Sequence, residues 1–337
     1  MKTFKSIELL NNQKLKLIDQ TKLPLAEEYI VSDNYERIAV SIERLEVRGA
    51  PAIGITAAYA LALSFKNTVD NYEYRFSTVY DRLASTRPTA VNLFWALEEM
   101  KKVFEANKNR ETLFAELLGT AIKIHEDDNE MSREMARNGL PIFVKKSRVL
   151  THCNTGALAA GGFGTAFGII KNAYEHNLVE FVHADETRPL LQGSRLTAFE
   201  LEKAGVPFAI NTDSTAAFLM QQNKVDLVIV GSDRIAVNGD AANKIGTYSL
   251  AVLCNYHKIP FYIAAPTTTI DKSCKTGRDI KIEFRNKSEV SQIKNVAVTK
   301  DDYEVFSPAF DVTPNKLITA IITEKGLHKP PYNFSDV

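Results

Sequence analysis

Two reactive side chains stand just past the ends of short apolar runs of this chain. Cys153 follows the run from Arg148 to His152, and Asp233 follows the run from Leu227 to Val230. Runs of this length and composition are typical of buried parallel strands, and α/β proteins bind their ligands at the carboxyl ends of such strands. A thiolate and a carboxylate can each move a proton or attack an electrophile. We therefore predict that Cys153 and Asp233 form a candidate catalytic pair.

The turn after Cys153 predicts an anion-binding site. It is expected to lead through Gly156 directly into a helix of small residues, whose free N–H groups and positive dipole end suit a sugar phosphate. The same dipole would lower the pKa of the thiol. The alternative is a buried structural cysteine, which is our interpretation of Cys254 and Cys274. Adjacent strand residues point to opposite faces, so His152 is interpreted as packing rather than as a partner of the thiol.

Polar residues that suit a phosphorylated ligand surround Asp233. The segment from Asn243 to Thr247 is expected to open the next helix and to place an amide and the Lys244 ammonium beside the same strand end. The long polar loop from Asp185 to Arg195 follows another predicted strand and is expected to carry ligand contacts. The alternative for Asp233 is an ion pair with Arg234 or a helix cap.

Two arginines stand next to predicted helix starts in the first part of the chain. Arg48 lies in the segment from Val47 to Pro51, before an apolar helix, and Arg87 lies in the segment from Ser85 to Ala90, before another. A guanidinium group binds phosphate through two parallel N–H donors, so the two arginines suit a phosphate clamp. The alternative is that both are surface charges.

A glycine-rich segment from Gly162 to Gly168 resembles the fingerprint of dinucleotide-binding proteins, which raises the hypothesis of a nicotinamide-dependent dehydrogenase. These glycines are expected inside the helix rather than in the strand-to-helix turn, and the third stands one residue too far along the chain. We therefore interpret them as allowing close helix packing. Failure to bind NAD would remove the dehydrogenase hypothesis.

The elements that must position these residues fall into two parts. From Asn34 to about Lys145 the apolar residues recur at helical spacing, after a hairpin formed by Ile7 to Leu10 and Leu15 to Ile18. From Pro141 onwards, short apolar runs alternate with helix-compatible segments, as in a parallel sheet with crossover helices. The predicted strands are Arg148 to His152, Val179 to His183, Phe208 to Ile210, Leu227 to Val230 and Phe261 to Ala264. The predicted helices are Leu196 to Ala204, ended by Gly205, Thr215 to Gln222 and Ala242 to His257. We expect an α/β protein with a small helical domain over residues 1–140 and a Rossmann-like, doubly wound domain over residues 141–337.

The composition of the 337 residues argues against several classes of protein. Lys plus Arg and Asp plus Glu number 41 each, so no excess positive charge would attract nucleic acid or an anionic membrane surface. No apolar run is long enough for a membrane span or a signal peptide, so we expect a cytoplasmic protein. The three cysteines are too widely spaced for a zinc site or a disulfide framework, and the six histidines lack ligand spacing, so no metal is predicted.

Taken together, these motifs resemble those of the 5-methylthioribose-1-phosphate isomerase family of methionine salvage, which is related to the regulatory subunits of initiation factor 2B. The resemblance covers the chain almost end to end. The matching runs are VRGAPAIG (Val47 to Gly54), TRPTAVN (Thr86 to Asn92), THCNTGA (Thr151 to Ala157), ETRPLLQGSRL (Glu186 to Leu196), VGSDRIAVNGDAANKIGTY (Val230 to Tyr248) and PAFDVTP (Pro308 to Pro314).

The resemblance implies roles for particular residues. Asp233 would donate a proton to the ring oxygen during ring opening and then assist transfer between C2 and C1, while Cys153 would take or stabilise the migrating proton. The phosphate and sugar of the substrate would be held by Arg48, Gly49, Ala50, Arg87, Gln192, Asn243 and Lys244. The substrate would be a phosphorylated pentose, isomerised by a homodimer that uses neither a metal nor an organic cofactor.

Two alternatives stay open beside this resemblance. One is a dedicated 5-deoxyribose-1-phosphate isomerase of 5-deoxypentose salvage, because Ile282 to Arg285 holds an aromatic where a second acid is expected and Gln292 to Val298 lacks the usual glycine. Activity on both sugars is expected, since an apolar pocket discriminates a thiomethyl group by only about 1–3 kcal/mol. The other alternative is a non-catalytic regulatory subunit like those of initiation factor 2B, which does not need Cys153 and Asp233.

Overall fold

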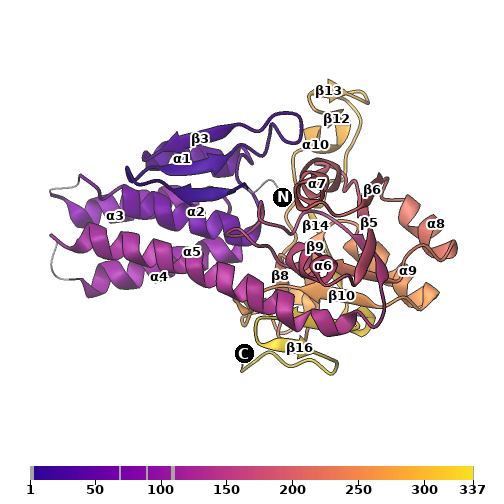
Figure 1. The fold of residues 1–337 in the computed structure, drawn as a ribbon. Coiled ribbons are helices and arrows are strands. Elements are labelled where there is room, and N and C mark those ends of the chain that lie inside the picture. The colour runs from indigo at the N-terminus through magenta and orange to yellow at the C-terminus, as the bar shows by residue number, and fades with distance from the viewer. Residues whose placement is uncertain (1–3, 68–69, 89, 108–110, 337) are drawn as a thin grey trace. The chain divides into compact units, whose positions relative to one another are not determined.

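Figure 1 shows the computed structural model of the protein, which describes residues 4–67, 70–88, 90–107 and 111–336. The chain divides into two compact units. The helical unit contains residues 4–133 together with Gly156–Gly164, and the sheet unit contains Glu134–Thr155 and residues 165–336. The segment that follows the Cys153 turn therefore belongs to the helical unit, although the chain on both sides of it belongs to the sheet unit. The expected domain boundary at residue 140 stays a prediction.

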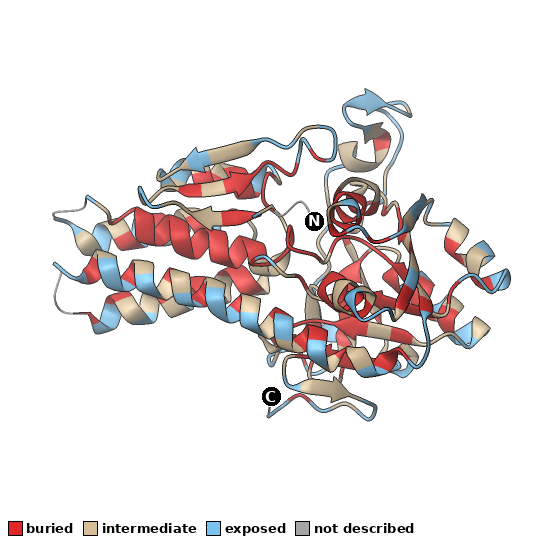
Figure 2. Ribbon diagram, in the orientation of Figure 1, coloured by how far each residue is buried: buried red, intermediate tan, exposed pale blue. Residues whose placement is uncertain are grey.

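The helical unit has at its centre a helix that is apolar on every side. This helix, α2 (Ala50–Leu63), is buried at every residue from Ala52 to Leu63, as Figure 2 shows along its length. A helix without a polar face is stable only when other elements surround it. The other helices are α1 (Tyr35–Glu43), α3 (Tyr72–Ala84), α4 (Val91–Ala106) and α5 (Leu113–Asn138), which ends in the sheet unit. An antiparallel sheet of β1 (Ile7–Leu9), β2 (Leu15–Ile18) and β3 (Tyr29–Ser32) confirms the predicted hairpin and adds a third strand.

The first strand of the sheet unit lies in the interior of the main sheet and not at its edge. The strand order is β16-β15-β10-β7-β4-β5-β6, and every pair is parallel except β15 with β16. The strands are β4 (Ser147–Thr151), β5 (Val179–Asp185), β6 (Phe208–Asn211), β7 (Leu227–Val230), β10 (Phe261–Ala264), β15 (Ala320–Thr323) and β16 (Gly326–His328). The five predicted strands are confirmed at nearly their expected positions, and so is the α/β fold with a parallel sheet.

Helices cover both faces of this sheet. Successive residues of a strand point to opposite faces, so neighbouring residues of one strand pack against different helices. Val228 and Val230 of β7 lie in one apolar cluster, and Ile229 lies in another. The cluster of Ile229 also contains residues of α6 (Ala166–Glu175) and α7 (Ala198–Ala204). The opposite cluster contains residues of α8 (Thr215–Gln221) and α9 (Thr247–His257). Among the described residues, no helix is long and apolar enough to cross a membrane.

The predicted helix start at Gly156 is wrong. Helix α6 begins only at Ala166, and the intervening loop contains Gly162 and Gly164 with φ angles of 147° and 93°. A positive φ is incompatible with a right-handed helix and is tolerated mainly by glycine. The interpretation of these glycines as helix-packing residues is therefore wrong for Gly162 and Gly164, whereas Gly168 does lie in α6.

The predicted helix start at Asn243 is also wrong, because this residue and Lys244 end a strand. A second sheet has the order β11-β8-β9-β14, and α9 begins only after Gly246, whose φ is 104°. Its strands are β8 (Arg234–Ala236), β9 (Ala241–Lys244), β11 (Ile270–Asp271) and β14 (Phe310–Thr313). The short elements α10 (Ser288–Ser291), β12 (Gln292–Ile293) and β13 (Val296–Ala297) lie between β11 and β14 in sequence.

Helix α5 holds the loop Gly156–Gly164 through the backbone of Gly161. The Gly161 N–H donates to Asp128 Oδ2 at 2.6 Å, and its carbonyl accepts from His125 Nε2 and from Asn129 Nδ2. Asp128 is only 6% exposed, and burial raises the pKa of this carboxyl to about 6. The loop that follows Cys153 is thus attached to the helical unit by buried polar contacts.

Candidate active site

The two candidate catalytic residues follow neighbouring strands at the point where the strand order reverses. Cys153 follows β4 and Asp233 follows β7, and Val149 of β4 lies beside Leu227 of β7 in parallel register. The chain continues from β4 towards β5, but from β7 towards β10 on the other side of the sheet. The direction of the connections therefore reverses between β4 and β7, and open α/β sheets bind ligands at the carboxyl ends of their strands at such a reversal.

The backbone of Cys153 is held in an unusual conformation. Its φ is 64°, its N–H donates to Thr187 Oγ1 at 2.8 Å, and its carbonyl accepts from Thr197 Oγ1 at 2.6 Å. The residue is 9% exposed. The expectation that a helix dipole activates this thiol is wrong, because a long loop separates Cys153 from the start of α6.

Asp233 is placed by the pairing of β8 with β9. Its N–H donates to Ala242 O at 2.9 Å, and the Ser232 hydroxyl donates to the same oxygen at 2.9 Å. The neighbouring Arg234 pairs with Asp271 at 3.0 Å. Asp233 itself is half-buried. The hairpin formed by β8 and β9 thus brings the β9 residues Asn243 and Lys244 into the same sheet as the strand that follows Asp233.

Asn243 and Lys244 offer buried polar groups at the end of β9. They are 4% and 9% exposed, and Asn243 Nδ2 donates to Thr247 Oγ1 at 3.0 Å. Lys244 Nζ donates to Ala309 O at 2.9 Å and lies 4.7 Å from the centre of the Phe310 ring. A buried ammonium group is a strong point charge for an anionic ligand, because little water screens it.

The N-terminus of α9 is already occupied by an acidic side chain. The Asp311 carboxylate accepts from the N–H groups of Gly246 at 2.7 Å and Tyr248 at 3.0 Å. A helix start of this kind would otherwise attract an anion through its free N–H groups and its dipole. The anion site that we expected at this helix end is therefore already filled by Asp311, and phosphate binding by the side chains of β9 stays a prediction.

Gln192 carries a buried acceptor that has no partner among the described residues. The residue is 3% exposed, and its Oε1 makes no hydrogen bond. Leaving such an atom unpaired is costly, and the hydroxyl of a bound sugar would satisfy it. The next residue must be glycine, since a Cβ on Gly193 would lie 1.6 Å from Asp185 O.

The remaining predicted site residues lie in the helical unit. Gly49 has a φ of 101°, and a Cβ on it would lie 2.4 Å from the Cα of Ala159. Ala50 opens α2, while Arg48 precedes it and Arg87 lies between α3 and α4. The structure thus groups Cys153, Asp233, Gln192, Asn243 and Lys244 in the sheet unit and Arg48, Gly49, Ala50 and Arg87 in the helical unit. The ligand-binding role of each stays a prediction.

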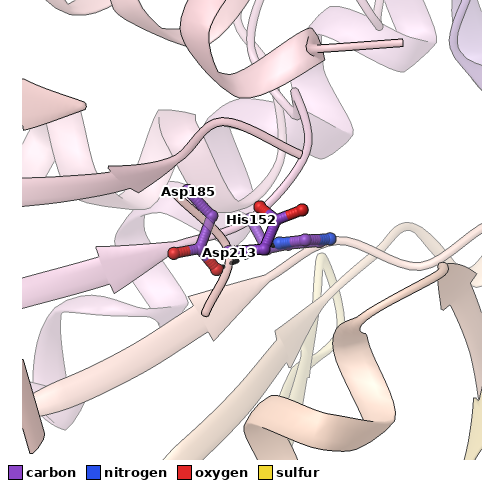
Figure 3. A group of neighbouring side chains, drawn as sticks. All are labelled: His152, Asp185 and Asp213. Atoms are coloured by element: carbon purple, nitrogen blue, oxygen red, sulfur yellow. Dashed lines mark hydrogen bonds and ion pairs between the residues drawn. The ribbon is translucent and has the colours of Figure 1, made fainter. Parts of the chain in front are cut away.

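A polar cluster beside Cys153, in which two of the three residues are buried and Asp213 is half-buried, was not expected. Figure 3 shows His152, Asp185 and Asp213 facing one another. One ring nitrogen of His152 and one carboxylate oxygen of each aspartate lie within 4.8 Å of one another. His152 Nδ1 is 3.0 Å from Asp185 Oδ2, and its Nε2 is 2.9 Å from Ile245 O. His152 is therefore hydrogen-bonded on both sides and does more than fill space, which corrects our interpretation of it as packing. Asp185 stands in the polar loop that the sequence singled out, but no sequence signal pointed to Asp213.

His152 and Asp185 share one proton inside this cluster. A carbonyl only accepts, so His152 Nε2 carries a hydrogen, and a second proton lies between Nδ1 and the Asp185 carboxyl. Burial alone would lower the pKa of His152, but the hydrogen bond and charge of Asp185 outweigh burial and raise it. The pKa of Asp185 is also raised, because the effect of burial on its carboxyl outweighs the hydrogen bond from His152, which lowers the pKa.

The four carboxylate oxygens of the cluster all have hydrogen-bonding partners already. Asp185 Oδ1 accepts from Asn211 Nδ2 at 2.6 Å. Asp213 Oδ1 accepts from the Thr187 N–H at 2.8 Å, and its Oδ2 accepts from the Arg188 N–H at 2.7 Å. Carboxylate oxygens that already accept hydrogen bonds suit a structural hydrogen-bond network better than a metal centre, in which the ligand oxygens face a cation.

The chain is similar over nearly its whole length to proteins of known structure or name. A model of the Initiation factor 2 subunit family matches residues 46–330. The methylthioribose-1-phosphate isomerase of Caldicellulosiruptor saccharolyticus is 48% identical over 325 residues, which cover 95% of each chain. The methylthioribose-1-phosphate isomerase of Thermotoga maritima is 48% identical over 329 residues, covering 97% of this chain and 96% of its own.

Two solved structures are also similar. The 5-methylthioribose 1-phosphate isomerase of Pyrococcus horikoshii OT3 has a TM-score of 0.92 and 40% identity, covering 98% of this chain and 94% of its own. A protein of A. fulgidus described as translation initiation factor eIF-2B, subunit delta, has a TM-score of 0.87 and 41% identity, covering 98% and 97%.

Proposed function

The chain belongs to the Initiation factor 2 subunit family, and within it we propose that this protein is an aldose–ketose isomerase. Its substrate is 5-methylthioribose 1-phosphate and its product is 5-methylthioribulose 1-phosphate, the conversion expected of methionine salvage. The observation that supports this most is the position of Cys153 and Asp233 at the ends of adjacent strands β4 and β7. The same chain is 48% identical to a relative named methylthioribose-1-phosphate isomerase over 95% of both lengths.

The reaction needs acid–base groups because C1 carries the phosphate and offers no free aldehyde. Asp233 donates a proton to the ring oxygen as the bond from C1 to that oxygen breaks, and it then assists the transfer between C2 and C1. Cys153 takes or stabilises the hydrogen that leaves C2. The hydrogen from C2 ends on C1, and the proton of the C2 hydroxyl passes to the Asp233 carboxylate as C2 becomes a carbonyl. Asp233 thereby regains the proton it gave to the ring oxygen, and the reaction requires no external oxidant. Groups that perform such transfers work best in a site that excludes water.

The other predicted residues bind the phosphate and the sugar. Lys244 supplies a buried positive charge, and Arg48 and Arg87 supply guanidinium groups that suit phosphate. The unpaired Gln192 Oε1 accepts from a sugar hydroxyl, which gives that atom the partner it lacks. These contacts recognise features that 5-methylthioribose 1-phosphate shares with 5-deoxyribose 1-phosphate. Some turnover of the second sugar therefore follows, with a preference of about 10- to 200-fold set by the thiomethyl group.

We further propose that the protein works as a homodimer in the cytoplasm. Helix α9 presents Tyr248, Val252 and Tyr256 at intervals of one turn, and these apolar side chains are 45%, 41% and 78% exposed. A row of exposed apolar side chains on one helix face is the kind of surface that a second copy of a chain covers.

A direct comparison of two substrates tests the proposed reaction. Ketose formation is followed on 5-methylthioribose 1-phosphate and 5-deoxyribose 1-phosphate, with wild type, Cys153→Ala and Asp233→Asn. Asp233→Asn should abolish turnover with a modest loss of substrate binding, because the amide cannot donate an acidic proton; losing a general acid costs about 10²- to 10⁴-fold. The matched control is Asp302→Asn, which makes the same change at an exposed position.

The outcomes separate the alternatives. Near-normal turnover by Asp233→Asn would contradict the assignment of the acid. A strong preference for 5-methylthioribose 1-phosphate supports methionine salvage, whereas parity or the reverse preference indicates 5-deoxypentose salvage. Turnover of neither sugar favours the alternative of a regulatory subunit; the A. fulgidus structure at 41% identity is described as translation initiation factor eIF-2B, subunit delta.

A further inference from the structure

We propose that Thr187 is a positioning residue for Cys153. Its hydroxyl holds the Cys153 backbone in the left-handed conformation that places the thiol, and Asp213 holds Thr187 in turn. This inference rests on the proposed role of Cys153, but part of its test requires no substrate.

The hydroxyl of Thr187 both accepts and donates a hydrogen bond. It accepts from the Cys153 N–H at 2.8 Å and donates to the carbonyl of Asp185 at 3.0 Å. Thr187 is completely buried, so no water competes for these bonds. The acceptor lone pair that faces Cys153 is therefore fixed by the donor bond on the other side, and the contact joins the loop after β4 to the loop after β5.

Both partners of this bond have backbone conformations that are rare for their residue types. Cys153 and Thr187 each have a φ of 64°. Residues with a Cβ seldom adopt this region, and a β-branched residue such as threonine does so least of all. Conformations of this kind persist only where the surroundings enforce them, and they gather at functional sites.

Asp213 holds the backbone of Thr187 in its left-handed conformation. Its two carboxylate oxygens accept from the consecutive N–H groups of Thr187 and Arg188, at 2.8 and 2.7 Å. Hydrogen bonds to a charged acceptor are about twice as strong as neutral ones, and two of them determine the direction of the peptide plane. Asp213 faces His152 and Asp185 in the same polar cluster (Figure 3). His152 extends that cluster to Ile245 in the turn before α9.

The network matters for chemistry because the position of the thiol depends on the φ angle of its own residue. Without an acceptor for its N–H, Cys153 would be free to relax towards the common negative φ region, and its Cβ and sulfur would move with it. A displacement of about 1 Å between reacting atoms can cost about 100-fold in rate. The predicted phosphate ligands of β9 lie on a different segment, so phosphate binding should change much less than turnover, and only Gln192 among the predicted ligands shares the loop of Thr187.

Two substitutions at Thr187 separate the hydroxyl from the rest of the side chain. Thr187→Val keeps the shape and removes the hydroxyl, whereas Thr187→Ser keeps the hydroxyl and removes a methyl group. We expect Thr187→Val to lower kcat by about 10- to 100-fold with KM within about threefold of wild type. Thr187→Ser should retain kcat within about threefold.

A second readout reports on the thiol without any substrate. The rate of Cys153 alkylation by iodoacetamide is measured by mass spectrometry, with the buried Cys254 and Cys274 as internal references. Thr187→Val should change the rate at Cys153 by about 3-fold or more, and Thr187→Ser should leave it near the wild-type value. If the wild type turns over neither sugar, the proposed reaction fails while the alkylation rates still decide whether Thr187 positions Cys153.

Two results would overturn the proposal. One is a Thr187→Val variant with wild-type kcat and wild-type alkylation rate. The other is equal loss of kcat in both Thr187 variants with unchanged alkylation, which would mean that the threonine serves general stability. If Thr187→Val does not fold, Asp213→Asn removes one of the two carboxylate acceptors and should lower kcat and change the Cys153 alkylation rate in the same direction. A folded Asp213→Asn variant with both quantities unchanged would also refute the proposal.

Discussion

Replacing Asp128 by asparagine should remove a pH-dependent loss of stability from the helical unit. The carboxyl is 6% exposed and accepts a hydrogen bond from the Gly161 N–H, and among the described residues no cation pairs with it. Burial raises its pKa from 3.8 to about 6, although the hydrogen bond from Gly161 opposes this. The folded state thus holds the proton of Asp128 more tightly than the unfolded chain does.

The direction of the effect follows from this difference in proton binding. A carboxyl with a raised pKa contributes its full stability below the unfolded value near pH 4, and that stability is lost as the pH rises through about 6. At about 1.4 kcal/mol for each pH unit, a rise in pKa from 3.8 to about 6 corresponds to about 3 kcal/mol in total. Asparagine has no proton to lose, so it should not show this loss.

Urea unfolding of wild type and Asp128→Asn at a series of pH values measures the effect. The free energy of unfolding of Asp128→Asn relative to wild type should rise by about 2 kcal/mol between about pH 4.5 and about pH 8. The matched control is Asp127→Asn, on the exposed face of the same helix, which changes the same formal charge. A difference between wild type and Asp128→Asn that stays constant with pH, or that falls as pH rises, would refute the reasoning.

Two further predictions concern the helical unit and the assembly. Gly49→Ala should lower the stability of the helical unit by about 2–4 kcal/mol, because the residue has a positive φ and its new Cβ would collide with the Ala159 backbone. Thermal unfolding measures this loss, with Gly119→Ala as the control, because a Cβ at Gly119 meets nothing within 4 Å. Equal melting temperatures of the two variants would contradict the prediction. Light scattering of the purified protein should give a mass of twice 37.6 kDa, and a monomer mass at micromolar concentration would contradict the homodimer.

The strand-end positions of Cys153 and Asp233 could be predicted because buried strands leave a local signature. A run such as Leu227–Val230 is apolar at every residue since both faces of its sheet are covered, and polar residues begin where that cover ends. The same logic located the polar loop that contains Gln192. Local composition therefore identified these positions without knowledge of which strands are neighbours.

Helix starts were harder to predict, because small residues are compatible with both helix and loop. The residues after Cys153 have a helix-compatible composition, but Gly162 and Gly164 adopt positive φ angles and the segment joins the helical unit. Asn243 and Lys244 have no strong local preference, and pairing with β8 and β14 makes them a strand. In both places tertiary contacts outweigh the local propensity.

By itself, the sequence determined the alternation of strands and helices, the helical first part, the balanced charge and the reactive residues at two strand ends. Only the tertiary structure decided that β4 and β7 are neighbours at the reversal of strand order, and that His152, Asp185 and Asp213 meet beside Cys153. It also decided the left-handed backbone of Thr187. The physical reason is that hydrophobic periodicity encodes burial residue by residue, whereas strand order and hydrogen bonds between distant loops depend on contacts that form only when the whole sheet is assembled.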